Sequence, residues 1–134
     1  MVYTFLGFFE YPTAMKMRAI RGAIQVEANT VEAINESVKE LLTAILAGNS
    51  LEIDDVISVI LTSTPDLTAD FPAAAAREIG FGAIPLLCAA EIAVPGALGR
   101  VVRVMLHCES GLERAEINHI YLKGATVLRK DLAQ

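Results

Sequence analysis

The segment from Gly99 to Cys108, GRVVRVMLHC, constrains the fold more than any other part of the chain. Its side chains are too apolar for a surface loop, and its β-branched valines favour a strand over a helix. Arg103 nevertheless stands in the middle of this strand. Because a buried guanidinium is costly unless it is paired, Arg103 must face something polar. Arg100, three residues earlier, falls on the opposite face of a strand and is expected to face solvent.

Hydrophobic periodicity predicts the other elements of the chain. Residues 17–27 alternate as a strand, with Ile20 and Arg21 on opposite faces. Residues 28–48 form the clearest helix, capped by Asn29 or Thr30 and ended by Gly48. We also expect strands at 56–61 and 84–89, a turn at 62–66, helices at 72–79 and 111–117, and extended pieces at 118–122 and 125–128. This order predicts one α/β (α+β) fold with helices packed on a mixed β-sheet.

The composition indicates that copies of the chain associate. The 134 residues are 54% apolar, with a mean hydropathy of +0.48. A single domain of this length has too little interior for so much apolar surface. Interfaces between identical chains are more apolar than ordinary surface, so we expect a homo-oligomer.

Other bulk features exclude several classes of protein. No apolar run approaches the roughly 18 residues of a transmembrane helix, and the N-terminal stretch makes a poor signal peptide because no basic region precedes it. Cys88 and Cys108 show no C-x-x-C spacing and are expected to be free thiols in a cytoplasmic protein. The net charge of −5 argues against nucleic acid or an anionic membrane as a partner.

Familiar catalytic and metal-binding motifs are absent from the sequence. It contains no G-x-G-x-x-G, P-loop or G-x-S-x-G motif. His107, Cys108 and His119 match no standard metal spacing, and we expect no metal site. Adjacent strand residues such as His107 and Cys108 also point to opposite faces.

What remains is a set of arginines associated with apolar strands. Arg21, Arg103 and Arg129 each lie within or directly after such a strand. A single arginine of this kind can cap a sheet edge or bind a neighbouring carboxylate. Three of them, together with Tyr121 and Glu91, predict a polar pocket, and the planar guanidinium suits carboxylate or phosphate groups.

Several separated motifs resemble one known family. AIRGAIQVEANT, TPDLTADFPAAAARE, CAAE, RVVRVM and HIYLKGATVLRKDL resemble, in this order and spacing, the monofunctional bacterial chorismate mutases of the trimeric α/β-barrel type. The resemblance runs from Met17 to Leu132. It implies one domain over residues 17–134 and leaves residues 1–16 as an extension of unknown role.

The resemblance implies an isomerase that rearranges chorismate to prephenate without cofactor or metal. It also implies a pseudo-barrel homotrimer with active sites between neighbouring chains. By this resemblance, Arg21 would bind a substrate carboxylate, Arg103 would contact the ether oxygen of the breaking bond, and Tyr121 would help hold the side-chain carboxylate. Glu91 would accept a hydrogen bond from the ring hydroxyl, with Cys88 nearby. Phe71 and Arg77 would line the cleft from the adjacent chain, and a mobile C-terminal segment with Leu128 and Arg129 would close over the site.

The chemistry of the implied reaction suits these residue types. A concerted Claisen rearrangement needs no nucleophile and no proton transfer, so the protein must position the substrate and stabilise the charge that develops as the C–O bond breaks. Two alternatives remain at this point. One is an imine or enamine deaminase of similar trimeric architecture, and the other is a non-enzymatic trimer that binds an anion.

Overall fold

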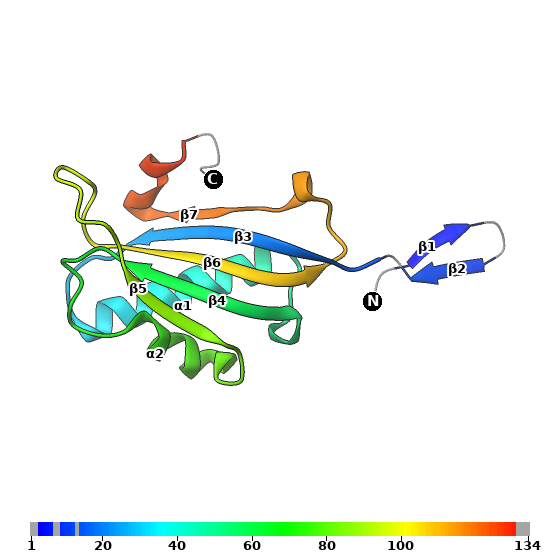
Figure 1. Cartoon of the computed structure of the whole chain (residues 1–134), viewed down its shortest axis with the longest axis horizontal. Coiled ribbons are helices and arrows are strands. Elements are labelled where there is room, and N and C mark those ends of the chain that lie inside the picture. The colour runs from blue at the N-terminus through cyan, green and yellow to red at the C-terminus, as the bar shows by residue number, and fades with distance from the viewer. Residues whose placement is uncertain (1–2, 7–8, 13, 131–134) are drawn as a thin grey trace.

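The structure is a computed structural model that describes residues 3–6, 9–12 and 14–130. Its centre is a five-stranded sheet in the order β5-β4-β6-β3-β7 (Figure 1). Strand β6 pairs antiparallel with β3 and β4, whereas β7 and β5 run parallel to β3 and β4 respectively. The mixed sheet predicted from the sequence is therefore confirmed. The strands are β3 (Lys16–Gln25), β4 (Val56–Ser63), β5 (Leu86–Ala90), β6 (Val101–Ser110) and β7 (Ile120–Leu122).

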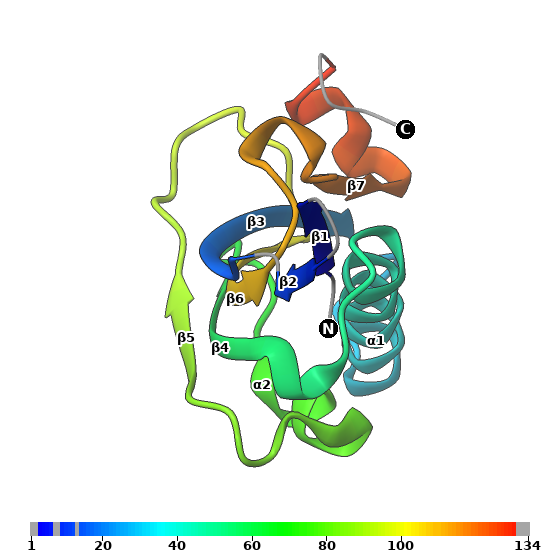
Figure 2. The ribbon, with the colours of Figure 1, turned by 90° about the vertical axis from the view of Figure 1, so that its right-hand side faces the viewer.

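The two α-helices lie on one side of this sheet (Figure 2). Helix α1 (Val31–Gly48) starts after Thr30, whose Oγ1 accepts a hydrogen bond from the Ala33 N–H at 3.1 Å. Its apolar stripe is buried against the sheet, as the 3.6-residue period predicts. Helix α2 (Pro72–Ala76) begins with proline and is continued by an irregular turn, η2 (Arg77–Phe81). The buried stripe of α1 consists of Ile34, Val38, Leu41, Leu42 and Ile45.

The side of the sheet that faces away from the helices is open and partly apolar. Ile60 on β4 pairs with Leu87 on β5 and with Met105 on β6. Leu87 is 61% exposed and Ile60 is 38% exposed. Met17 on β3 is exposed as well. Within the described residues, nothing in one copy of the chain covers these side chains.

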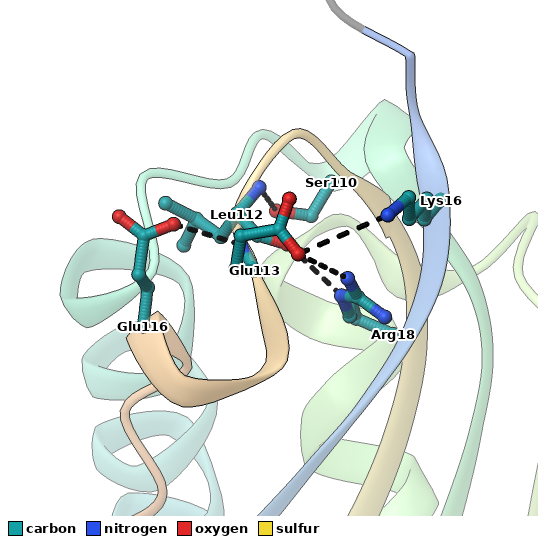
Figure 3. Close-up of polar contacts among 6 residues, drawn as sticks. All are labelled: Lys16, Arg18, Ser110, Leu112, Glu113 and Glu116. Carbon is teal, nitrogen blue, oxygen red and sulfur yellow. Dashed lines mark hydrogen bonds and ion pairs between the residues drawn. The ribbon is translucent and has the colours of Figure 1, made fainter.

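Loop 111–117, which connects β6 to β7, is fixed to the first residues of β3 (Figure 3). Arg18 Nε donates a hydrogen bond to the Leu112 carbonyl oxygen at 2.9 Å. Glu113 Oε2 lies 3.6 Å from Arg18 Nη2 and 3.8 Å from Lys16 Nζ. Within this loop, the expected helix is only a short 3₁₀ turn, η3 (Arg114–Glu116).

Three further local expectations were wrong. Strand β4 continues through Thr62 and Ser63 instead of turning at 62, because both residues pair with β5 and with β6. The helix expected at 72–79 is α-helical only to Ala76, and Gly80 adopts a left-handed φ of +106° in the following turn. The piece expected to be extended at 125–128 belongs to a 3₁₀ helix, η4 (Lys123–Leu128).

The reason for η4 is its packing. Positions i and i+3 of a 3₁₀ helix lie on the same side, and Ala125 and Leu128 both pack on a small cluster with Tyr121 and Val101. The N-terminal stretch holds two antiparallel strands, β1 (Tyr3–Leu6) and β2 (Phe9–Pro12). They lie beyond the start of β3, apart from the main sheet (Figure 1).

Candidate active site

Five of the nine predicted site residues line one cavity on the open side of the sheet. The cavity has a volume of about 310 Å³ and is walled by β3, β4, β6, β7 and the end of η4. Apart from the predicted residues, Thr62 and Met105 contribute to its wall. The predicted residues that it brings together are Arg21, Arg103, Tyr121, Leu128 and Arg129.

Strand register explains why side chains from three strands converge here. Ala23 on β3 pairs with Arg103 on β6 and with Tyr121 on β7. Paired residues share a face of the sheet, and Arg21, two residues before Ala23, shares it too. Ala23 is fully buried and small, so the longer side chains on either side of it can approach the same space.

Arg103 has the polar partner that a charge within an apolar strand requires. Its Nε lies 3.2 Å from Glu91 Oε1 and donates a hydrogen bond to it. The other carboxylate oxygen, Oε2, accepts a hydrogen bond from Thr62 Oγ1 at 2.7 Å. The Arg103 side chain is 45% exposed, whereas that of Glu91 is only 15% exposed. The guanidinium is therefore both paired and open to the cavity.

Arg100 is exposed on the surface, as expected. Its Nε donates to the Val26 carbonyl oxygen at 2.9 Å, and its N–H donates to Asp66 Oδ2 at the same distance. Hydrogen bonds from the Thr64 side chain and the Arg100 backbone lower the pKa of Asp66. Arg100 thus fixes the loop that enters β6 and lies outside the cavity.

The other three predicted residues gather elsewhere in the chain. Phe71, Arg77 and Cys88 line a separate cavity of about 330 Å³ between α2 and β5. Cys88 pairs with Leu61, which is fully buried on the helix side of β4, so its thiol points away from the face that carries Arg103. Phe71 is 70% exposed. One copy of the chain therefore does not place these residues beside Arg103.

The sequence analysis missed Thr62, which lines the cavity, and His119, which lies outside it and contacts Arg21. Thr62 was assigned to a turn, and only its pairing opposite Arg103 brings its hydroxyl to Glu91. His119 was considered only as a metal ligand, but its Nδ1 accepts a hydrogen bond from the Arg21 N–H at 2.9 Å. Burial, followed by the charges of Arg21 and Arg129, lowers the pKa of His119.

Residues 3–6, 9–12 and 14–130 contain no group of three or more His, Cys, Asp or Glu side chains arranged to hold a metal ion. In the same part of the chain, no helix is both long enough and apolar enough to cross a membrane.

Comparisons with known proteins identify the family of the chain. Residues 17–132 match the family model for chorismate mutase type I. The chain is 45% identical to chorismate mutase AroH of Thermus thermophilus over 87% of this chain and 96% of that protein. It is 41% identical to chorismate mutase AroH of Bacillus subtilis (strain 168) over 89% and 94% of the respective chains. A solved structure of a chorismate mutase from Clostridium thermocellum superposes with a TM-score of 0.81 at 45% identity, covering 82% of this chain and 98% of that one. On these grounds the chain belongs to the chorismate mutase type I family.

Proposed function

We propose that the cavity between Arg21, Arg103 and Tyr121 is where this chorismate mutase rearranges chorismate to prephenate. The observation that carries the proposal is the convergence of these side chains on one face of the sheet, with Glu91 held by both Arg103 and Thr62. The site presents fixed charge and hydrogen-bond donors, which is what an intramolecular rearrangement of a dianion requires.

Each side chain has a proposed role that follows from its chemistry. Arg103 uses Nε on Glu91, and its Nη groups supply further N–H donors for the ether oxygen as the C–O bond breaks. Arg21, Arg129 and Tyr121 bind the two carboxylates of the substrate. The Glu91 carboxylate, positioned by hydrogen bonds from Arg103 and Thr62, accepts a hydrogen bond from the ring hydroxyl.

The direct test follows the loss of chorismate by its ultraviolet absorbance and identifies prephenate as the product. We expect turnover by the purified protein in the presence of a chelator, and the same turnover after added metal. Binding of chorismate without conversion would contradict the proposed function. Conversion that persists undiminished in both Arg21→Ala and Arg103→Ala would place the reaction outside this cavity.

We further propose that the active protein is a homotrimer and that each site is completed by a neighbouring chain. The exposed apolar residues on the open side of the sheet, Ile60 and Leu87, supply a surface for association. The separate cavity with Phe71, Arg77 and Cys88 supplies the second half of a shared site. Leu128 and Arg129 close it from the end of η4, and residues 131–134 lie outside the described residues.

Mixing two inactive variants tests this shared site. Arg103→Ala and Arg77→Ala remove groups that the proposal assigns to different chains of one site. Unfolding and refolding the two variants together at equal amounts should restore about a quarter of the sites, because each chain position is filled at random. Either variant refolded alone is the control. No recovery in the mixture, or a monomer in sedimentation equilibrium, would contradict the shared site.

The catalytic domain proposed here is residues 17–134, with residues 1–16 as a dispensable extension. The hairpin of β1 and β2 lies apart from the main sheet (Figure 1), and the family match starts at residue 17. Deleting residues 1–14 keeps all of β3, whereas deleting 1–16 also removes Lys16 and its contact with Glu113. That exposed pair is worth about 0–1 kcal/mol, so both deletions should preserve kcat/KM. A large loss in the shorter deletion would show that the extension is required.

A further inference from the structure

His119 makes an unusual contact at the edge of the proposed site. The parallel pairing of β3 with β7 starts at Gly22 and Ile120. One residue earlier, the partner of β3 is the His119 side chain and not the backbone of β7, because His119 Nδ1 accepts a hydrogen bond from the Arg21 N–H at 2.9 Å. A ring nitrogen that accepts a hydrogen bond carries no proton, so this contact requires the neutral imidazole with its proton on Nε2.

The surroundings of His119 favour this neutral form. Burial raises the cost of a positive charge on the ring, and the charges of Arg21 and Arg129 raise it further. The ring also lines a second cavity of about 320 Å³, which contains Arg18, His107 and Arg114 and no carboxylate. The charged side chains that line this cavity or act on the ring are the cations Arg18, Arg21, Arg114 and Arg129. The carboxylates of loop 111–117 are engaged elsewhere, because Glu113 lies against Arg18 and Lys16 and Glu116 accepts a hydrogen bond from the Glu113 N–H.

We propose that His119 is a positioning residue whose neutral imidazole keeps Arg21 and Tyr121 in register for the substrate, so that its protonation lowers activity. This inference rests on the proposed function of the cavity. The protonated ring would turn an N–H toward the Arg21 N–H, and two donors cannot bond to each other. The hydrogen bond between β3 and β7 would be lost beside two residues of the site, and a third cation would stand next to Arg21 and Arg129.

Nuclear magnetic resonance tests the protonation state without measuring activity. The chain has two histidines, His107 and His119, so His107→Asn assigns both ring signals. We expect His119 to be the Nε2–H tautomer at pH 7 and to titrate below the usual value near 6.5. A ring protonated on Nδ1 at pH 7 would rule out the contact with Arg21 and overturn the proposal.

Two substitutions at position 119 distinguish the effect of losing the hydrogen-bond acceptor from the effect of protonating the ring. Asparagine carries a side-chain oxygen at the δ position and does not titrate, whereas alanine has no acceptor. His119→Asn should keep kcat/KM within about threefold of the wild type at pH 7.5, and His119→Ala should lose about tenfold because a backbone donor is left unsatisfied. In acid, the wild type should lose activity relative to His119→Asn by one-proton titration.

The control is His107→Asn, a change of the same kind at the same cavity. Among the described residues, the His107 side chain has no hydrogen bond or ion pair, so the pH profile of His107→Asn should match the wild type. Titration of the substrate affects the wild type and the variant alike and cancels in the ratio to His119→Asn. If His119→Ala lowered only the melting temperature and kept a normal kcat/KM at each pH, His119 would not position the site. If Arg103→Ala also left kcat unchanged, the proposed function would fail as well.

Discussion

Replacing Arg103 by alanine should damage catalysis far more than stability. In the free protein, Arg103 makes one ion pair with Glu91 and is 45% exposed. Solvent screens such a pair, and pairs near the surface contribute about 0–1 kcal/mol to folding. Glu91 also keeps its hydrogen bond from Thr62, so the change does not leave a bare carboxylate. We expect the melting temperature to fall by a few degrees at most.

The catalytic loss should be much larger. Removing one preorganised donor from a developing oxyanion costs roughly 10²- to 10³-fold in kcat, or about 2.7–4 kcal/mol. The loss should appear in kcat more than in KM, because the charge on the ether oxygen grows only as the bond breaks. Arg103→Lys should recover part of the activity, since it restores a cation but not the planar fork.

Steady-state kinetics and thermal unfolding are measured on the same preparation, at one protein concentration for all variants. Together they show whether Arg103 serves catalysis or only the fold. Arg100→Ala is the matched control, because Arg100 belongs to the same segment, binds the Val26 carbonyl oxygen and lines no cavity with Arg103. It should lose about 1 kcal/mol of stability and keep its kcat. A destabilised Arg103→Ala protein with normal kcat would refute the reasoning, because Arg103 would then serve only the fold.

Three further predictions follow from specific contacts. Glu91→Gln should lower kcat/KM by about tenfold and leave measurable activity. The amide oxygen can still accept from Arg103 and the amide NH2 can donate to the Thr62 hydroxyl, but the group carries no charge. A wild-type value for Glu91→Ala would contradict the role of Glu91. Gly22→Ala should reduce stability by about 1–3 kcal/mol in urea titrations, since its Cβ would lie 2.7 Å from Ile45 Cδ1. Ellman's reagent should modify Cys88 faster than Cys108, because Cys108 is fully buried and burial raises its pKa; equal rates would show that the thiols are equally shielded.

The elements predicted correctly from sequence are those fixed by local periodicity. The stripe of α1 and the alternation of β6 both bury the residues that their periods select. The strand expected at 84–89 is present as β5, and Glu91 directly follows its end. The expectation that Arg103 faces a polar group is also confirmed, because its guanidinium pairs with the Glu91 carboxylate.

The features that the sequence did not predict depend on contacts between segments that lie far apart in the chain. Thr62 continues β4 only because strands lie on both of its sides, and nothing local distinguishes it from a turn residue. His119 gains a role only once β7 is known to run beside β3. The segment 125–128 has strand-like residues, but packing against Tyr121 and Val101 makes it 3₁₀. Tertiary contacts outweigh weak local preference in all three cases.

The stable core and the proposed chemistry of this chain depend on the same alternation. On β6, Val102, Val104, Leu106 and Cys108 are buried on the helix side, and their burial fixes the register of the strand. A slip of one residue would expose these side chains and turn Arg103 into the core. The free energy of burying the whole apolar stripe therefore stabilises the register that keeps Arg103 on the open face. A reaction that requires only positioned charge can be built this way, from separate arginines on neighbouring strands, which explains why no compact catalytic motif marks the sequence.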